Sequence, residues 1–408
     1  MEAAWRQKQE KQTTTRVGKG KQVMAEYAMK TASCDGRLES IDALRGFDML
    51  FIMGLSGVIE QICVALGFGK DCWLALQMHH PKWIGLTQHD TIFPLFIFIA
   101  GLSFPFSMSK QLEHGRTKAQ IAWRSLRRMA ALVLLGMVFE GFFMGKEFRY
   151  GMVLARIGIS WACASWLFLA FGVKVRAIIA GGILLGYWAL NVLVPAPGHT
   201  LAEVFAPTGN ISAWVDWTVL RPISRIHPGS PEYPFDNQGL LATIPSIVTA
   251  MLGMFTGEFV RWARNRLSGG RQVALLFAAA AAFTAAGCLM AFGCGRWSFP
   301  IIKPIWSSSF ALILGGYSIA MFALFYWLID VNGCWRRTLF LRVIGLNAIT
   351  IYVAQPLFSL GHTRTMLFGR FAGMFPERLS GLVLAIGYLA ICWAILWFLH
   401  KRKIYLKV

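Results

Sequence analysis

The chain has 408 residues, of which 56% are hydrophobic and only 15% are charged. Soluble globular proteins carry about 25% charged residues, so this composition excludes an ordinary soluble enzyme. The chain is also basic, with 40 Lys and Arg against 20 Asp and Glu and a formal net charge of +20. An apolar and basic composition favours a polytopic membrane protein over a nucleic-acid-binding domain or a disordered chain.

The first 36 residues form a polar segment rich in Lys and Arg, which we interpret as a flexible cytoplasmic tail. We interpret residues 37–408 as one transmembrane domain. Apolar runs of roughly 17 to 25 residues recur in it, the length that crosses about 30 Å of hydrocarbon. They predict an all-α fold with about ten transmembrane helices. The runs cover residues 44–66, 91–109, 129–145, 157–172, 178–196, 239–259, 273–293, 307–329, 343–360 and 380–399.

The loops between these runs differ in their basic residues. With the N-terminus inside, 28 of the 40 Lys and Arg lie on the inner side, counting the tail and Arg45, and 12 lie on the outer side. Because basic loops stay in the cytoplasm, this bias predicts that both termini are cytoplasmic. Cys72 and Cys294 then share the outer side, where a disulfide would need an oxidising compartment.

The first outer loop, which leads into the second run, holds the densest group of chemically active side chains. His79, His80, His89 and Asp90 lie within it. An imidazole beside a carboxylate at the membrane edge can act as a general base, a nucleophile or a metal ligand. The spacing matches no recognised zinc pattern, so we expect no metal.

Other charged residues also lie in or near the apolar runs, where they mark functional sites by default. Asp42 and Arg45 stand at the start of the first run, although their i, i+3 spacing also allows a simple ion pair on one helix face. Lys303 lies in an outer segment whose prolines favour a re-entrant or interfacial element. The sequence has no phosphate-binding loop or dinucleotide turn. Its basic residues follow the predicted topology, so we expect no nucleic-acid partner.

Six sequence blocks, in order from about residue 37 to the C-terminus, resemble the heparan-α-glucosaminide N-acetyltransferase family and its bacterial transmembrane relatives. The most specific block reads His80-x-x-Trp83-x-Gly85-Leu86-Thr87-x-x-Asp90-x-x-Phe93-Pro94. The other blocks begin at Arg37, Arg149, Asp236, Lys303 and Gly345.

The resemblance implies transfer of an acetyl group from cytosolic acetyl-CoA to the amine of glucosamine or a terminal glucosaminide on the periplasmic side. It also implies the bacterial inner membrane as the location and a homodimer as the assembly. The family's active-site histidine corresponds to His80, and we expect Asp90 to orient its ring. His80 acts either as the base for the amine or as the acceptor of the acetyl group, and the sequence leaves both open.

The remaining predicted site residues follow from charge and from the matching blocks. Anionic CoA is expected at the cytoplasmic mouth, where guanidinium groups suit phosphates, although these arginines equally fit the positive-inside bias. The predicted cofactor-binding residues are Arg45, Arg124, Arg127, Arg128, Trp306, Asn347 and Tyr352. The predicted sugar-binding residues are Trp83, Asp236 and Lys303. An amino-sugar permease is the alternative function, and the lack of a convincing internal repeat counts against it.

Overall fold

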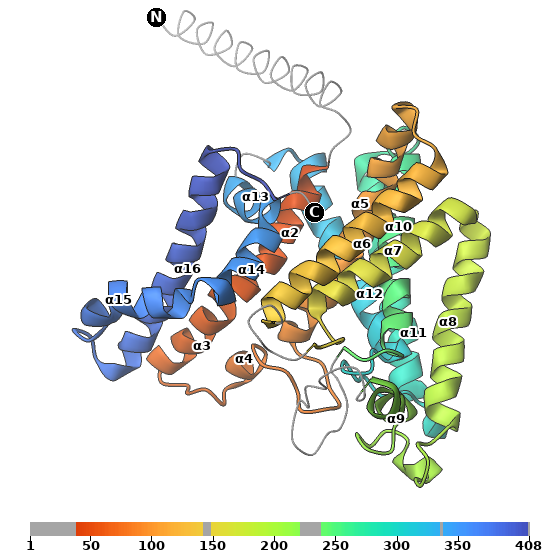
Figure 1. The fold of residues 1–408 in the computed structure, drawn as a ribbon, viewed down its shortest axis with the longest axis horizontal. Coiled ribbons are helices and arrows are strands. Elements are labelled where there is room, and N and C mark those ends of the chain that lie inside the picture. The colour runs from red at the N-terminus through yellow and green to blue at the C-terminus, as the bar shows by residue number, and fades with distance from the viewer. Residues whose placement is uncertain (1–37, 142–147, 221–237, 335–337, 407–408) are drawn as a thin grey trace, which may run out of the picture. The chain divides into compact units, whose positions relative to one another are not determined.

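The computed structural model describes residues 38–141, 148–220, 238–334 and 338–406. One compact unit begins at Glu39 and continues to the end of the chain (Figure 1). Its described residues are predominantly helical, and β-pairing among them is limited to two isolated bridges. The prediction of an all-α fold is therefore confirmed.

The helices of this unit form two groups, which we call the first and second lobes. The first lobe combines residues 39–65 with residues 339–401 and is drawn in red and blue in Figure 1. It consists of α2 (Glu39–Leu50), a π-helical turn (Phe51–Leu55), α3 (Ser56–Ala65), α13 (Leu339–Leu346), α14 (Ala348–Leu357), α15 (Leu360–Ala372) and α16 (Glu377–Lys401).

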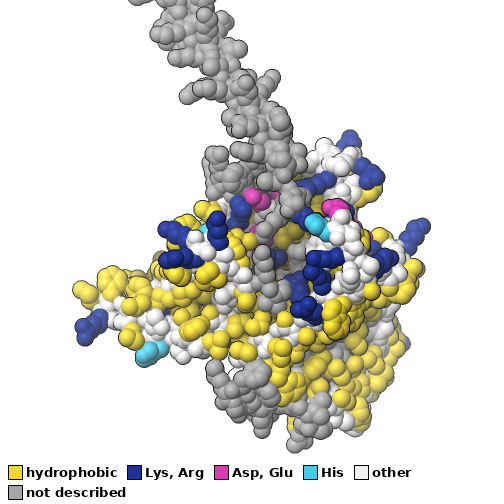
Figure 2. Space-filling model, turned by 45° about the horizontal axis from the view of Figure 1, so that its top comes forward, with side chains coloured by type: hydrophobic (Ala, Val, Ile, Leu, Met, Phe, Trp, Pro, Cys, Tyr) yellow, Lys and Arg dark blue, Asp and Glu magenta, His cyan; other side chains and the backbone are white. Residues whose placement is uncertain are grey.

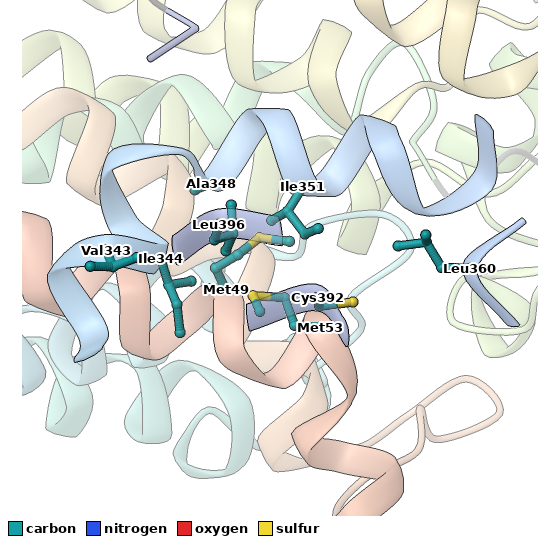
Figure 3. Close-up of a cluster of buried hydrophobic side chains, with 9 residues drawn as sticks. All are labelled: Met49, Met53, Val343, Ile344, Ala348, Ile351, Leu360, Cys392 and Leu396. Carbon is teal, nitrogen blue, oxygen red and sulfur yellow. The ribbon is translucent and has the colours of Figure 1, made fainter. Parts of the chain in front are cut away.

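A cluster of buried apolar side chains holds the first lobe together (Figure 3). Its members come from α2, the π-helical turn, α13, α14, α15 and α16, so residues about 300 positions apart share one core. Gly46 and Gly345 let α2 and α13 approach closely, because a Cβ on either glycine would collide with the backbone of the other helix. The cluster consists of Met49, Met53, Val343, Ile344, Ala348, Ile351, Leu360, Cys392 and Leu396.

The second lobe contains the middle of the chain. Its α5, α10 and α12 are buried along most of their length, whereas α11 is mostly exposed. A Cβ on Gly101 of α5 would collide with the Ala250 carbonyl of α10, so small residues permit this central contact. The lobe consists of α5 (Ile92–Glu113), α6 (Lys118–Glu140), α7 (Val153–Ala170), α8 (Val173–Leu193), α9 (Ile211–Val215), α10 (Thr243–Ala263), α11 (Gly269–Cys288) and α12 (Ser308–Tyr326).

Eight helices among the described residues are long and apolar enough to cross a membrane. They coincide with eight of the ten predicted runs, which confirms the membrane-protein class. Residues 129–140 of the run at 129–145 fall in α6, a helix of 23 residues whose charged side chains reduce its hydropathy, and residues 142–145 lie outside the described residues. The run at 343–360 is interrupted at Asn347, which separates α13 from α14. The total of ten spans remains a prediction.

Basic side chains gather at one end of the bundle, above a broad apolar belt (Figure 2). The ends of α5, α10 and α16 lie there, with Lys110, Arg261 and Lys401 in their last turns. This distribution agrees with the predicted cytoplasmic side, although the sidedness itself remains a prediction. Cys72 and Cys294, which share the opposite side in that topology, are both free thiols.

Candidate active site

The loop that precedes α5 positions Asp90 by local hydrogen bonding. A short 3₁₀ helix, Gln88–Thr91, leads directly into α5, and Thr87 and Asp90 form a reciprocal capping box around its start. The Thr87 backbone N–H donates to Asp90 Oδ2 at 3.1 Å. The Asp90 carboxylate is fully buried, so this bond fixes one of its oxygens and leaves the other for the side chains around it.

A contact between two distant loops brings Lys303 to the same place. Ile84 forms an isolated antiparallel bridge with Ile302, and the Gly85 N–H donates to the Ile301 carbonyl at 3.0 Å. Gly85 has a φ of 137°, a conformation that favours glycine. The loop before α12 therefore lies against the loop before α5, and its Lys303 reaches the buried carboxylate.

Asp90, His80 and Lys303 form one hydrogen-bonded group. His80 Nδ1 donates to Asp90 Oδ1 at 2.7 Å, and Lys303 Nζ lies 3.0 Å from the same oxygen. Lys303 Nζ also lies 3.1 and 3.4 Å from the two ring nitrogens of His80, which places the ammonium against the imidazole. Because Nδ1 is committed to Asp90, Nε2 is the nitrogen of His80 that remains for chemistry.

The charges in this group compensate one another. The buried Asp90 carboxylate has Lys303 as its cation, and the Lys303 side chain is itself only 18% exposed. Burial lowers the pKa of Lys303, and the neighbouring Asp90 opposes part of that effect. His80 is more accessible, with 52% of its side chain exposed. A fixed and partly accessible imidazole on a buried carboxylate is suited to proton transfer or nucleophilic attack.

A second imidazole lies beside the first. The rings of His80 and His89 are 4.6 Å apart at their centroids, and His89 Nδ1 lies 3.3 Å from Ser56 Oγ. His79 turns away and lies 3.1 Å from Glu60, so the four donors considered for a metal do not converge. The site thus contains two histidines with different partners, a carboxylate for His80 and a hydroxyl for His89.

Both histidines line a cavity of about 290 Å³ between the two lobes. Its walls come from α2, α5, α6, α7 and α14, and Gln238 and Lys303 contribute from loops. Along α5 the lining begins at Ile92, and the opposite end lies near Ser103, to which Arg45 donates a hydrogen bond at 3.5 Å. The eleven residue steps of helix from Ile92 to Ser103 correspond to about 16 Å, so the cavity spans roughly half the hydrocarbon thickness.

The opposite end of the cavity is cationic. Arg45 and Arg128 line it, and Arg45 is paired with Asp42 at 3.4 Å. The Arg128 guanidinium stacks over the Trp161 ring at 4.3 Å, and its Nε has no hydrogen-bond partner. No carboxylate of the described residues lies within ion-pairing distance of Arg128. This end therefore carries uncompensated positive charge and is suited to an anion.

The structure brings only part of the predicted site together. Arg45, Arg128, His80, Lys303 and Tyr352 line the cavity, and Asp90 lies directly behind His80.

Several predicted residues lie elsewhere. Arg124 and Arg127 are exposed, and Arg124 donates to Gln111. Asn347 is buried at the break before α14, where its side chain donates to the Ile404 carbonyl. Asp236 lies outside the described residues.

The two predicted tryptophans act as supports beneath the site. Trp83 donates to the Phe205 carbonyl at 2.7 Å and packs with Ile302 in a buried cluster. Trp306 is fully buried and meets Phe93, a cavity residue, edge to face at 5.2 Å. Their positions hold the two loops and α5 in place, and neither side chain lines the cavity.

The sequence places His89 among the outer histidines and assigns it no separate role. A helical repeat is the signal that identifies it, because His89, Ile92, Phe93, Phe96 and Ala100 all line the cavity and follow the spacing of one helix face. Ser56 lies on another helix, so no local sequence pattern predicts its contact with His89.

Human heparan-alpha-glucosaminide N-acetyltransferase (Homo sapiens) is 26% identical over 373 residues, which cover 79% of this chain and 53% of the human protein. The mouse protein of the same name (Mus musculus) is 25% identical over 378 residues, covering 81% of this chain and 55% of its own. The chain is a distant relative of this family. It spans about half the length of these curated relatives, and no protein-family model matches it.

Proposed function

We propose that the chain is a transmembrane N-acetyltransferase. It would move the acetyl group of cytosolic acetyl-CoA to the amine of glucosamine or a terminal glucosaminide on the periplasmic side of the bacterial inner membrane. The observation that carries this proposal is that one cavity has uncompensated arginine charge at one end and a carboxylate-bound histidine at the other. The distant relationship to the glucosaminide acetyltransferases supports the reaction and the substrate class.

The cationic end of the cavity fits the phosphates of CoA. Arg128 and Arg45 present guanidinium groups, which bind phosphate oxygens through paired hydrogen bonds. The pantetheine arm would then run between the lobes along Met49, Phe96 and Leu132, an apolar path toward His80. In this arrangement no protein carrier has to move across the bilayer with the acetyl group.

At the histidine end, the two imidazoles allow the acetyl-histidine route. His80 Nε2 attacks the thioester carbonyl, the C–S bond breaks and CoA leaves as the thiolate. Asp90 accepts a hydrogen bond from Nδ1–H of His80 and stabilises the acetylated ring. The sugar amine then attacks the acetyl group, the bond to Nε2 breaks, and the amine proton passes to His89. Lys303 places positive charge beside the oxyanion that develops in both steps.

Direct transfer is the other route, with His80 as the base for the amine. It needs only one imidazole, so it gives His89 no role, although His89 lines the cavity. The acetyl-histidine route requires a base separate from the acetylated ring, and His89 is within ring contact of His80. We therefore favour the two-histidine sequence.

A vectorial assay tests the proposed function. Purified chain is reconstituted in proteoliposomes, with labelled acetyl-CoA on the side of the basic loops and glucosamine on the opposite side. We expect labelled N-acetylglucosamine on the glucosamine side, and none when acetyl-CoA is moved across. Product formation only with both substrates on one side would contradict transmembrane transfer.

The same vesicles separate the enzyme from a permease. A permease would carry unmodified glucosamine across the bilayer in the absence of acetyl-CoA, which labelled glucosamine would reveal. The expected homodimer is a separate prediction, which mass photometry of the detergent-solubilised chain would check.

A further inference from the structure

A second cavity, which shares no lining residue with the first, opens among α8, α10, α11 and α12. It has a volume of about 690 Å³ and is lined almost wholly by aliphatic and aromatic side chains. On α8 it extends from Val173 to Leu184, and on α10 from Phe259 back to Val248. Eleven residues of helix measure about 16 Å, which is close to the thickness of one membrane leaflet. The cavity is therefore about as long as the acyl-chain layer of one leaflet is thick.

Small side chains keep this cavity open. Ala177, Ala180 and Gly181 face it from α8, and Ala279 faces it from α11. A Cβ added to Gly181 would meet no atom within 4 Å, so this part of α8 is separated from its neighbours by free space. An empty space of this size in a bilayer would be filled by hydrocarbon, because the lining is almost wholly apolar and its one hydroxyl, on Thr256, already donates to the Leu252 carbonyl.

The mouth of this cavity lies at the basic end of the bundle. An adjoining hollow shares Val173, Phe255 and Phe259 with it and adds Glu258, Arg261 and Trp262.

The charge at the mouth is positive. Glu258 is paired with Arg176 at 2.8 Å. Arg261 is exposed and donates to the Pro105 carbonyl at 3.0 Å, and no carboxylate of the described residues pairs with it. One guanidinium therefore remains available where the apolar cavity meets the membrane surface.

We propose that this cavity is a binding site for an anionic phospholipid of the inner leaflet. One acyl chain occupies the space between α8 and α11, and the headgroup phosphate contacts Arg261. The indole of Trp262, which is 51% exposed, lies at the headgroup level, as interfacial tryptophans do. A lipid tail gains little by leaving the bilayer for an apolar cavity, so the selectivity resides in the headgroup.

Native mass spectrometry of the detergent-purified full chain tests this proposal. Phosphatidylglycerol and phosphatidylcholine with identical acyl chains are added together. One basic contact at a membrane surface favours an anionic headgroup by about fivefold, so we expect the wild type to retain phosphatidylglycerol by about that ratio. Equal retention of the two lipids would overturn the proposed anionic selectivity.

Two pairs of variants locate the lipid. Gly181→Leu fills the cavity and should abolish retention, whereas Gly186→Leu, also on α8 with open space around it but outside the lining, should retain lipid like the wild type. Arg261→Gln should remove the preference for phosphatidylglycerol, and Arg402→Gln, an exposed arginine of the other lobe, should keep it.

Identical retention in both glycine variants would overturn the site, and identical preference in both arginine variants would overturn the headgroup contact. Because Arg261 is exposed, its variant provides a test even if the Gly181 variant fails to fold.

Discussion

The two ends of the cavity between the lobes differ in whether their charges are paired. At the histidine end, the Asp90 carboxylate is fully buried and is met by Lys303, His80 and the Thr87 backbone within 3.1 Å. At the arginine end, Arg128 has no carboxylate partner among the described residues, and aromatic stacking holds it in place. A closed network fixes geometry, which chemistry requires, whereas an unpaired cation leaves energy available for binding an anion.

Removing the His80 imidazole should have the largest effect on activity, because it removes the centre of the histidine end. His80→Ala should lower kcat/KM for acetyl transfer by about 10³-fold, because both proposed roles of His80 are lost. The control is His79→Ala, since His79 is the adjacent histidine but pairs with Glu60 outside the cavity. Steady-state rates with labelled acetyl-CoA measure both. Equal rates for the two variants would refute the role of His80.

Breaking the ion pair at the histidine end should destabilise the fold. Lys303→Met leaves the buried Asp90 without its cation and should cost about 3 kcal/mol, measured by denaturant unfolding in detergent. The double variant Asp90→Asn with Lys303→Met removes both charges and should cost less than the sum of the two single changes. Strict additivity would mean that the two charges do not depend on each other.

The second histidine distinguishes the two chemical routes. His89→Gln should slow acetyl transfer to the amine by about 10²-fold, because the amine loses its base, while the first release of CoA stays fast. A stopped-flow thiol assay would show this as a burst of CoA followed by slow turnover. Loss of the burst together with turnover would place His89 in the first step, and wild-type turnover would remove it from the mechanism.

The arginine end should affect binding more than chemistry. Arg128→Gln should raise the KM for acetyl-CoA about tenfold with little change in kcat, because one charge-assisted contact to phosphate is lost. Arg127→Gln provides a matched control, since Arg127 is the neighbouring residue but is exposed. Equal KM values for the two variants would show that the cavity does not hold the phosphates.

Adjacent arginines also show the limit of the sequence. By charge, Arg127 and Arg128 are equally good candidates for binding phosphate, yet only Arg128 lines the cavity. Neighbouring positions on a helix point about 100° apart, so the packing of α6 against α7 and α14 decides which one is useful. Asn347 illustrates the same limit, because it belongs to a matching block but binds the carbonyl of Ile404.

The sequence by itself determined the properties that depend on short stretches of chain. Apolar runs of membrane length gave the helical class, and the His80 block identified the distant family, because hydrocarbon burial and local motifs act within a few turns. Only the tertiary structure decided that Lys303 reaches Asp90, through a contact between loops more than 200 residues apart, and that His89 meets Ser56. Such contacts depend on how whole helices pack, and no local pattern in the chain records them.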